Sequence, residues 1–195
     1  MLQKYLDSIK DAPVLRVDFM GRMEDNKKFF SVCKKSFPTL LSELEDPSYV
    51  DVPVGWRFTV LQLLAKLEEL KTVRLRQVKQ KFGSLRVYVD VDNPIDSRLA
   101  DQLIGAATEE VSLVCEFCGS SNQVSLFEAG YVCNVCSPCT EILCSYTLVN
   151  WLLNGKSEQL NDAQLYCLKR LRGEKLPSMF DALNGLQKKL EEANG

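Results

Sequence analysis

The sequence predicts an α+β fold that is mostly helical, with a β-hairpin near the middle of the chain and a compact four-cysteine module after it. Three observations lead to this prediction. Apolar residues recur at helical spacing over residues 26–44 and 56–71. Residues 85–91 alternate between apolar and polar side chains, as in a half-buried strand. Two Cys-x-x-Cys pairs, Cys115–Cys118 and Cys136–Cys139, lie seventeen residues apart.

The first 50 residues are predicted to be mainly helical, because the apolar side chains between Asn26 and Leu44 follow one helical face. Pro38 lies inside this segment and lacks a backbone N–H. We therefore expect two helical pieces, one on each side of Pro38.

Residues 56–71 are predicted to form an amphipathic helix. Trp56 begins its apolar stripe and is expected to be a core anchor. Three charged residues then remain for solvent: Lys66, Glu68 and Glu69. A further helix is expected over residues 94–114.

Residues 73–91 are predicted to form a β-hairpin that turns near Gly83. Its second half alternates cleanly, but in its first half Val73 and Leu75 have the opposite parity to Val78. A β-bulge near Arg76–Gln77 would place all three apolar residues on one face.

The two cysteine pairs have the spacing of a four-thiolate zinc site with Cys115, Cys118, Cys136 and Cys139 as ligands. The chain has no histidine, so a transition-metal site here must consist mainly of sulfur. A closed site of this kind is structural, and we expect one Zn²⁺. Gly119 suits the turn after the first pair, and Pro138 suits a helix start within the second.

Between the pairs, residues 123–127 and 131–133 are predicted to form a short hairpin, and a helix is expected from Thr140. This order favours a treble-clef finger over a zinc ribbon, whose second pair would lead into another strand. Cys133 is an alternative ligand, because Cys133 and Cys136 also have Cys-x-x-Cys spacing. The isolated Cys33, Cys144 and Cys167 are expected to be small buried apolar residues.

Residues 71–86 contain six basic residues and no acidic one. The whole chain has a net charge of −2, so the remaining residues carry −8. A cationic hairpin on an anionic body could contact a polyanion, but basic residues also protect the edge of a sheet. The candidate contact residues are Lys79, Lys81, Arg86, Arg74, Arg76 and Tyr88, with Phe82 beside them.

The chain is predicted to divide into a helical and hairpin region over 1–114, a zinc-finger module running into a helix over 115–153, and a helical extension over 154–195. In the extension, helices are expected over about 160–172 and after Pro177. The beginning of the sequence lacks a signal-peptide pattern, and no apolar run is long enough for a membrane span. A cytoplasmic location is therefore expected.

Several segments resemble an uncharacterised family of small bacterial and phage proteins. They are Gly55-Trp56, the run Gln77 to Tyr88, Cys115-Glu116-Phe117-Cys118-Gly119, Gly130-Tyr131 and the pair Cys136 and Cys139. Members look like G-W, Q-V-K-x-K-F-G-x-L-R-x-Y, C-E-x-C-G, G-W and C-x-x-C in this order, with Tyr131 here in place of a Trp. The resemblance covers about residues 54–140 and implies the same ligand set, with Cys133 at a non-ligand position.

These patterns predict a protein that acts by binding. No histidine, phosphate-binding loop or nucleophile turn is present, so no catalytic constellation is recognised and no small-molecule substrate is indicated. The negative total charge and the large helical ends favour a protein partner, for an adaptor or inhibitor of a protein complex that phages could encode. The alternative is a nucleic-acid-binding protein that contacts phosphates through the hairpin 71–86.

Overall fold

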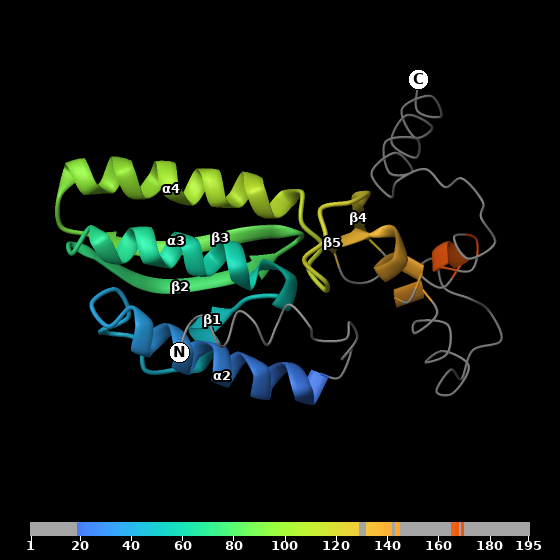
Figure 1. Ribbon diagram of the computed structural model, residues 1–195, viewed down its shortest axis with the longest axis horizontal. Helices are drawn as coiled ribbons and strands as arrows, with labels where there is room; N and C mark the ends of the chain where they lie inside the picture. Colours follow the sequence, from blue (N-terminus) through green and yellow to red (C-terminus); the bar gives the residue numbers. More distant parts are fainter. Residues whose placement is uncertain (1–18, 129–131, 142, 145–164, 168, 170–195) are drawn as a thin grey trace, which may run out of the picture.

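The computed structural model describes residues 19–128, 132–141, 143–144, 165–167 and 169 (Figure 1). It confirms a mixture of helices with small sheets. No helix in these residues has the length and apolarity that crossing a membrane requires. The elements are α2 (Phe19–Ser36), η1 (Pro47–Tyr49), β1 (Val50–Asp51), η2 (Val54–Trp56), α3 (Arg57–Glu69), β2 (Val73–Lys81), β3 (Ser84–Val91), α4 (Pro94–Ser112), β4 (Val124–Phe127) and β5 (Cys133–Cys136).

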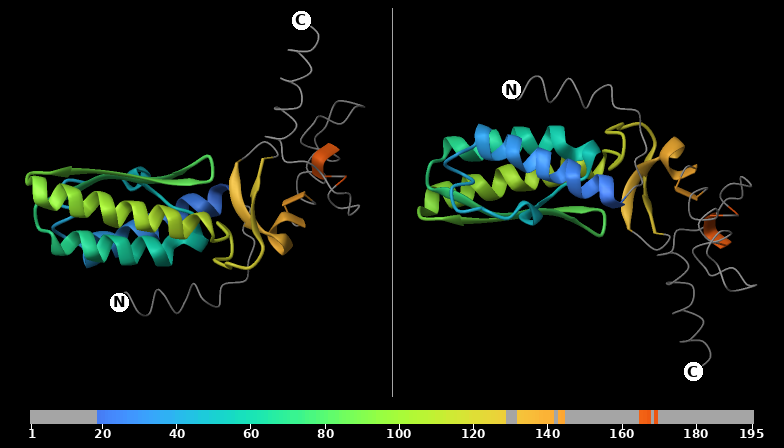
Figure 2. Two further views of the ribbon diagram at one scale, coloured as in Figure 1. Left: turned by 90° about the horizontal axis from the view of Figure 1, so that it is seen from above. Right: turned by 90° about the horizontal axis from the view of Figure 1, so that it is seen from below.

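Residues 19–114, here called the body, contain a three-stranded sheet in the order β1-β2-β3. Strands β2 and β3 are antiparallel, and β1 runs parallel to β2 with Val50 opposite Val78. Helices α3 and α4 pack on the hairpin, and α2 lies along β1 (Figures 1 and 2). One apolar core joins these elements. Its largest fully buried side chains include Trp56, Phe29, Leu40, Leu64, Leu75 and Leu85.

The hairpin agrees with the sequence prediction. The register shifts between Leu75 and Gln77, which places a bulge at Arg76. The turn residues Phe82 and Gly83 both have positive φ, 53° and 73°, as in a type I′ turn. Strand β1 was not predicted, because two residues are too few to show a period. Trp56 is fully buried, as expected of a core anchor.

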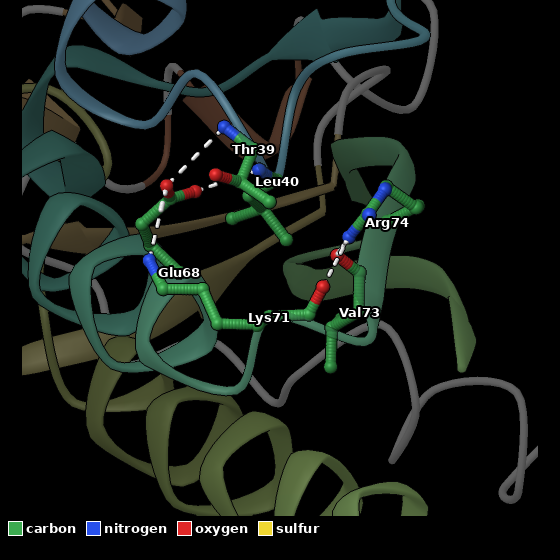
Figure 3. Close-up of polar contacts among 6 residues, drawn as sticks. All are labelled: Thr39, Leu40, Glu68, Lys71, Val73 and Arg74. Atoms are coloured by element: carbon green, nitrogen blue, oxygen red, sulfur yellow. Dashed lines mark hydrogen bonds and ion pairs between the residues drawn. The ribbon is translucent and has the colours of Figure 1, made fainter. Parts of the chain in front are cut away.

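The segment around Pro38 differs from the prediction. Helix α2 ends at Ser36, but residues 38–43 form turns instead of a second helical piece. The cause is a side chain from α3: the Glu68 carboxylate accepts hydrogen bonds from the N–H groups of Thr39 (3.2 Å) and Leu40 (2.6 Å), as Figure 3 shows. These N–H groups therefore have hydrogen-bond acceptors although residues 38–43 are not helical.

Glu68 was expected to face solvent, and this expectation is wrong. Its side chain is 15% exposed and lies between the turn after α2 and Lys71, whose ammonium is 3.6 Å from the carboxylate. Burial alone would raise the pKa of Glu68, but the hydrogen bonds from Leu40 and Thr39 and the attraction of Lys71 outweigh it and lower the pKa. A charged Glu68 thus holds the chain reversal after α2 against α3.

The predicted C-terminal helices over 160–172 and after Pro177 lie almost wholly outside the described residues. Residues 165–167 and 169 are helical. The predicted helix through residues 1–18 and the predicted division at residue 154 also fall outside the described ranges.

Candidate metal centre

The four predicted ligands converge. The sulfur atoms of Cys115, Cys118, Cys136 and Cys139 all lie within 4.8 Å of one another, and Cys118 Sγ is 3.5 Å from Cys136 Sγ. Tetrahedral coordination with metal–sulfur bonds of about 2.3 Å places sulfurs roughly 3.8 Å apart. The four thiols are therefore close enough to hold a metal ion. Cys133 lies opposite Phe127 at the start of β5 and is outside this group.

The first pair lies in a tight turn. The Cys115 N–H donates to Ser120 O (2.8 Å), and the Gly119 N–H donates to Cys115 O (3.0 Å). Gly119 has a φ of +74°, which confirms the conformation expected of it. This turn, residues 115–120, is called the knuckle below.

The second pair joins a strand to a helix. Strand β5 runs to Cys136, further than predicted, and pairs antiparallel with β4, with Val124 opposite Cys136. Residues 137–141 are helical, and Pro138 lies in the first turn of this helix, where the sequence predicted a helix start. The Thr140 hydroxyl donates to Cys136 O (3.1 Å).

The cluster is electrostatically suited to a cation. Burial raises the pKa of Cys118 to about 11 and raises the pKa of Cys139 further. Burial would also raise the pKa of Cys136, but a hydrogen bond from the Cys139 backbone and those from neighbouring thiols lower it. Four thiolates this close repel one another, and a divalent cation among them would reverse that repulsion.

The knuckle packs directly on Gly55 of the body. The Gly55 N–H donates to Glu116 O (2.8 Å), and a Cβ at position 55 would lie 2.0 Å from Cys115 O and 2.6 Å from Gly119 N. No side chain fits between two backbones at this distance. Next to it, Trp56 Nε1 donates to Val114 O (2.9 Å), which fixes the chain just before the first ligand.

Glu116 links the knuckle to the hairpin and to β5. Only 3% of Glu116 is exposed, and its Oε1 accepts from the Asn134 N–H (2.8 Å) and from Gln80 Nε2 (3.2 Å). Gln80 also donates to Val132 O (2.8 Å). Asn134 Nδ2 donates to Gly83 O (2.6 Å), and a Cβ at Gly83 would lie 2.7 Å from Leu126 Cδ1.

The body and the metal module, defined as the described residues 115–144, thus meet through a small set of hydrogen bonds and close backbone contacts. Gly55, Trp56, Gln80, Gly83 and Glu116 all lie at this contact. The sequence predicted Trp56 as a core anchor and Gly83 as a turn residue, but it predicted none of the five as a contact with the metal module. The signal that could have pointed to them is that all five lie in the segments on which the expected resemblance rests. Asn134 carried no comparable signal.

Two of the predicted contact residues are engaged within the protein. Arg76 pairs with Asp90 and Glu43, and its hydrogen bonds to these carboxylates raise the pKa of the guanidinium. Arg74 donates to the backbone oxygens of Lys71 (2.6 Å) and Val73 (2.8 Å) (Figure 3). Neither side chain is available as a freely placed cation.

The other predicted contact residues lie near the turn. Lys79 is opposite Arg86 in the hairpin, and within the described ranges neither these two nor Lys81 pairs with a carboxylate. Lys79 Nζ lies 5.7 Å from the Tyr88 ring centre, and Lys81 Nζ lies 5.5 Å from that of Phe82. Phe82 is 70% exposed and Tyr88 49%. We call Lys79, Lys81, Phe82, Arg86 and Tyr88 the tip surface.

Comparison of the chain with protein-family models, with curated proteins and with solved structures gave no match.

Proposed function

We propose that the four thiols bind one zinc ion and that this ion is structural. All-sulfur ligands at tetrahedral spacing suit zinc, and four protein ligands leave no open position for a reacting water. We further propose a treble-clef arrangement, supported by the order of knuckle, β4–β5 hairpin and a helix that begins at the second pair.

Elemental analysis of the purified chain tests the metal. We expect one zinc per chain, a loss of most of it in Cys136→Ser and an unchanged content in Cys133→Ser, since Cys133 is outside the cluster. Iron in place of zinc, or equal loss in both variants, would contradict the assignment.

We also propose that the chain is a non-enzymatic binding protein, an adaptor or inhibitor of a protein complex, that contacts its partner with the tip surface. The observation that carries this is the combination at one place of two exposed aromatic rings and three cations without a carboxylate partner in the described ranges. Exposed aromatic and arginine side chains are typical anchors of protein interfaces. The metal module fixes this surface through Asn134 and Gln80.

Affinity capture with matched variants tests the binding surface. The double variant Lys79→Glu, Lys81→Glu should lose a stoichiometric protein partner that the unchanged chain captures. Lys27→Glu, Lys28→Glu makes the same charge change at exposed positions on α2 and should keep the partner. Equal capture by both variants would show that the partner binds elsewhere.

Binding to single-stranded nucleic acid is a second candidate, because cations beside exposed rings also suit phosphates and stacked bases. With Arg74 and Arg76 engaged, three cations remain at the tip. The logarithm of affinity should then fall with log salt at a slope of about −2 for a single strand. Absence of binding at low salt removes this candidate.

A further inference from the structure

Strand β3 has an open edge. The sheet order β1-β2-β3 makes it a terminal strand, and within the described part of the chain nothing pairs with its outer side. The two-residue turn makes Lys81 and Ser84 the closing pair of the hairpin. Since hydrogen-bonded and non-hydrogen-bonded pairs alternate in an antiparallel ladder, the N–H and C=O groups of Leu85 and Val87 point to the open edge.

A groove runs along this edge between the hairpin and α4. Leu85 and Val87 line it from β3, and Ile104 and Thr108 line it from α4. The side chains of Lys81 and Arg86 also border it. The groove therefore offers unpaired backbone groups between an apolar wall and two cations, which is the arrangement that binds an added strand.

The charge of this edge selects the occupant. Lys81 and Arg86 pair with no carboxylate among the described residues, so an acidic segment would be attracted. A second copy of this chain would bring the same cations to the same edge, and like charges facing each other across two strands are destabilising.

The turn residue Phe82 points to binding independently. Its φ of 53° lies in the left-handed region, where an aromatic residue is an outlier and where type I′ turns prefer Asn, Asp or Gly. Because 70% of Phe82 is exposed, its side chain gains little free energy from packing against the body, and this packing does not offset the strain. A side chain in a strained conformation that is left in solvent beside the groove suggests a contact with a partner.

We propose that an acidic, extended segment of a partner protein adds to β3 as a fourth strand in this groove. The backbone of this segment forms hydrogen bonds with the backbone N–H and C=O groups of Leu85 and Val87. Its carboxylates lie near Lys81 and Arg86, and one of its apolar side chains covers Phe82. This inference rests on the proposed function and specifies the chemistry of the partner and the way it binds.

Selection of a displayed library of random 12-residue peptides on the full zinc-loaded chain tests the proposal. The enriched peptides should be acidic with alternating apolar residues. A synthetic copy of the best one should slow the amide exchange of Leu85 and Val87. N-methylation of its alternate backbone nitrogens should weaken binding at least tenfold while leaving the protein unchanged.

Charge-matched variants complete the test. Arg86→Glu should lower the affinity of the chain for the peptide at least tenfold. Lys28→Glu on α2 should leave this affinity unchanged. Enriched peptides without acidic bias, or tight binding with unchanged exchange at Leu85 and Val87, would overturn strand addition. So would self-association through this edge, or preference for a 12-residue oligothymidylate over the peptide.

The outcomes separate this inference from the proposed function. If the double lysine variant loses its captured protein but Leu85 and Val87 exchange as before in the complex, the tip surface binds a protein and strand addition is wrong. If neither the double lysine variant nor Arg86→Glu changes capture, both proposals are wrong.

Discussion

The body and the metal module are stabilised by different chemistry. The buried core of the body consists almost entirely of leucine, valine, phenylalanine, alanine and tryptophan side chains. In the second core cluster, which includes the metal module, six of the eight described buried residues are cysteines, and the other two are Phe127 and Val135. Apolar burial is extensive in the body and small among the described residues of the module, so under the proposed metal binding the ion would supply much of the folding free energy of the module.

Loss of the metal should unfold the metal module and leave the body folded. We expect this to be the largest of the effects predicted here. In Cys136→Ser the module should lose its fold, because structural zinc binding contributes on the order of 10–16 kcal/mol in small zinc peptides. Hydrogen exchange should then accelerate over residues 115–136 and remain slow in α3 and β2. Cys133→Ala is the control that keeps the metal. Exchange that accelerates equally in both regions would show that they form one cooperative unit.

Gly55→Ala should break the contact between the regions. The added Cβ would lie 2.0 Å from Cys115 O, and overpacking of this kind costs roughly 1–3 kcal/mol. Gly105→Ala is a matched control in α4, where a Cβ meets nothing within 4 Å. It should stabilise the chain by about 0.5–1 kcal/mol. Urea unfolding measures both, and a loss of stability in the control alone would contradict the expectation.

Glu68→Gln should destabilise the body by roughly 1–2 kcal/mol at pH 7, because it removes a charged acceptor from the N–H groups of Thr39 and Leu40. Folding lowers the pKa of Glu68 below its ordinary value of 4.5. Its contribution is therefore complete above pH 4.5 and is lost as the pH falls through the lowered value.

Urea unfolding of the unchanged chain and of Glu68→Gln, at pH 7 and near pH 3, measures this effect. The difference between the two chains should shrink at the lower pH. The neighbouring exposed residue gives the control, since Glu69→Gln should change stability by less than about 0.5 kcal/mol at either pH. A difference that stays constant with pH would exclude the charged acceptor as its cause.

Phe82→Asn should have the smallest effect on folding, and with the opposite sign. Asparagine adopts positive φ more readily, so we expect a gain of a few tenths of a kcal/mol in thermal unfolding. The same change should weaken partner binding. Gly83→Ala at the next position should destabilise, because its φ is +73° and its Cβ would lie 2.7 Å from Leu126 Cδ1. A loss of stability in Phe82→Asn would mean that the ring supports the fold.

The sequence predicted what local patterns determine. Alternation over residues 85–91 and the change of parity near Arg76 predicted the hairpin with its bulge, and the cysteine spacing predicted the thiol cluster. Residues far apart in the chain were not predictable in the same way. Glu68 has the polarity of a surface residue, and only the neighbouring turn makes it a half-buried acceptor.

The contact between the regions shows the same limit. Gly55 needs a glycine because the knuckle, about 60 residues later, packs against it. A single sequence does not show that two segments so far apart along the chain are in contact. The strand β1 depends on pairing with β2 for its existence, so its two residues carry no pattern of their own.

The place of Trp56 provides a built-in optical signal. Its indole is fully buried and hydrogen-bonds to the carbonyl that precedes the first ligand by one residue. In a chain carrying Trp151→Phe it is the sole tryptophan, so its emission would shift to longer wavelength when chelation releases the knuckle and water reaches the ring. A metal titration monitored by tryptophan fluorescence would then report in real time how the contact between the knuckle and the body forms.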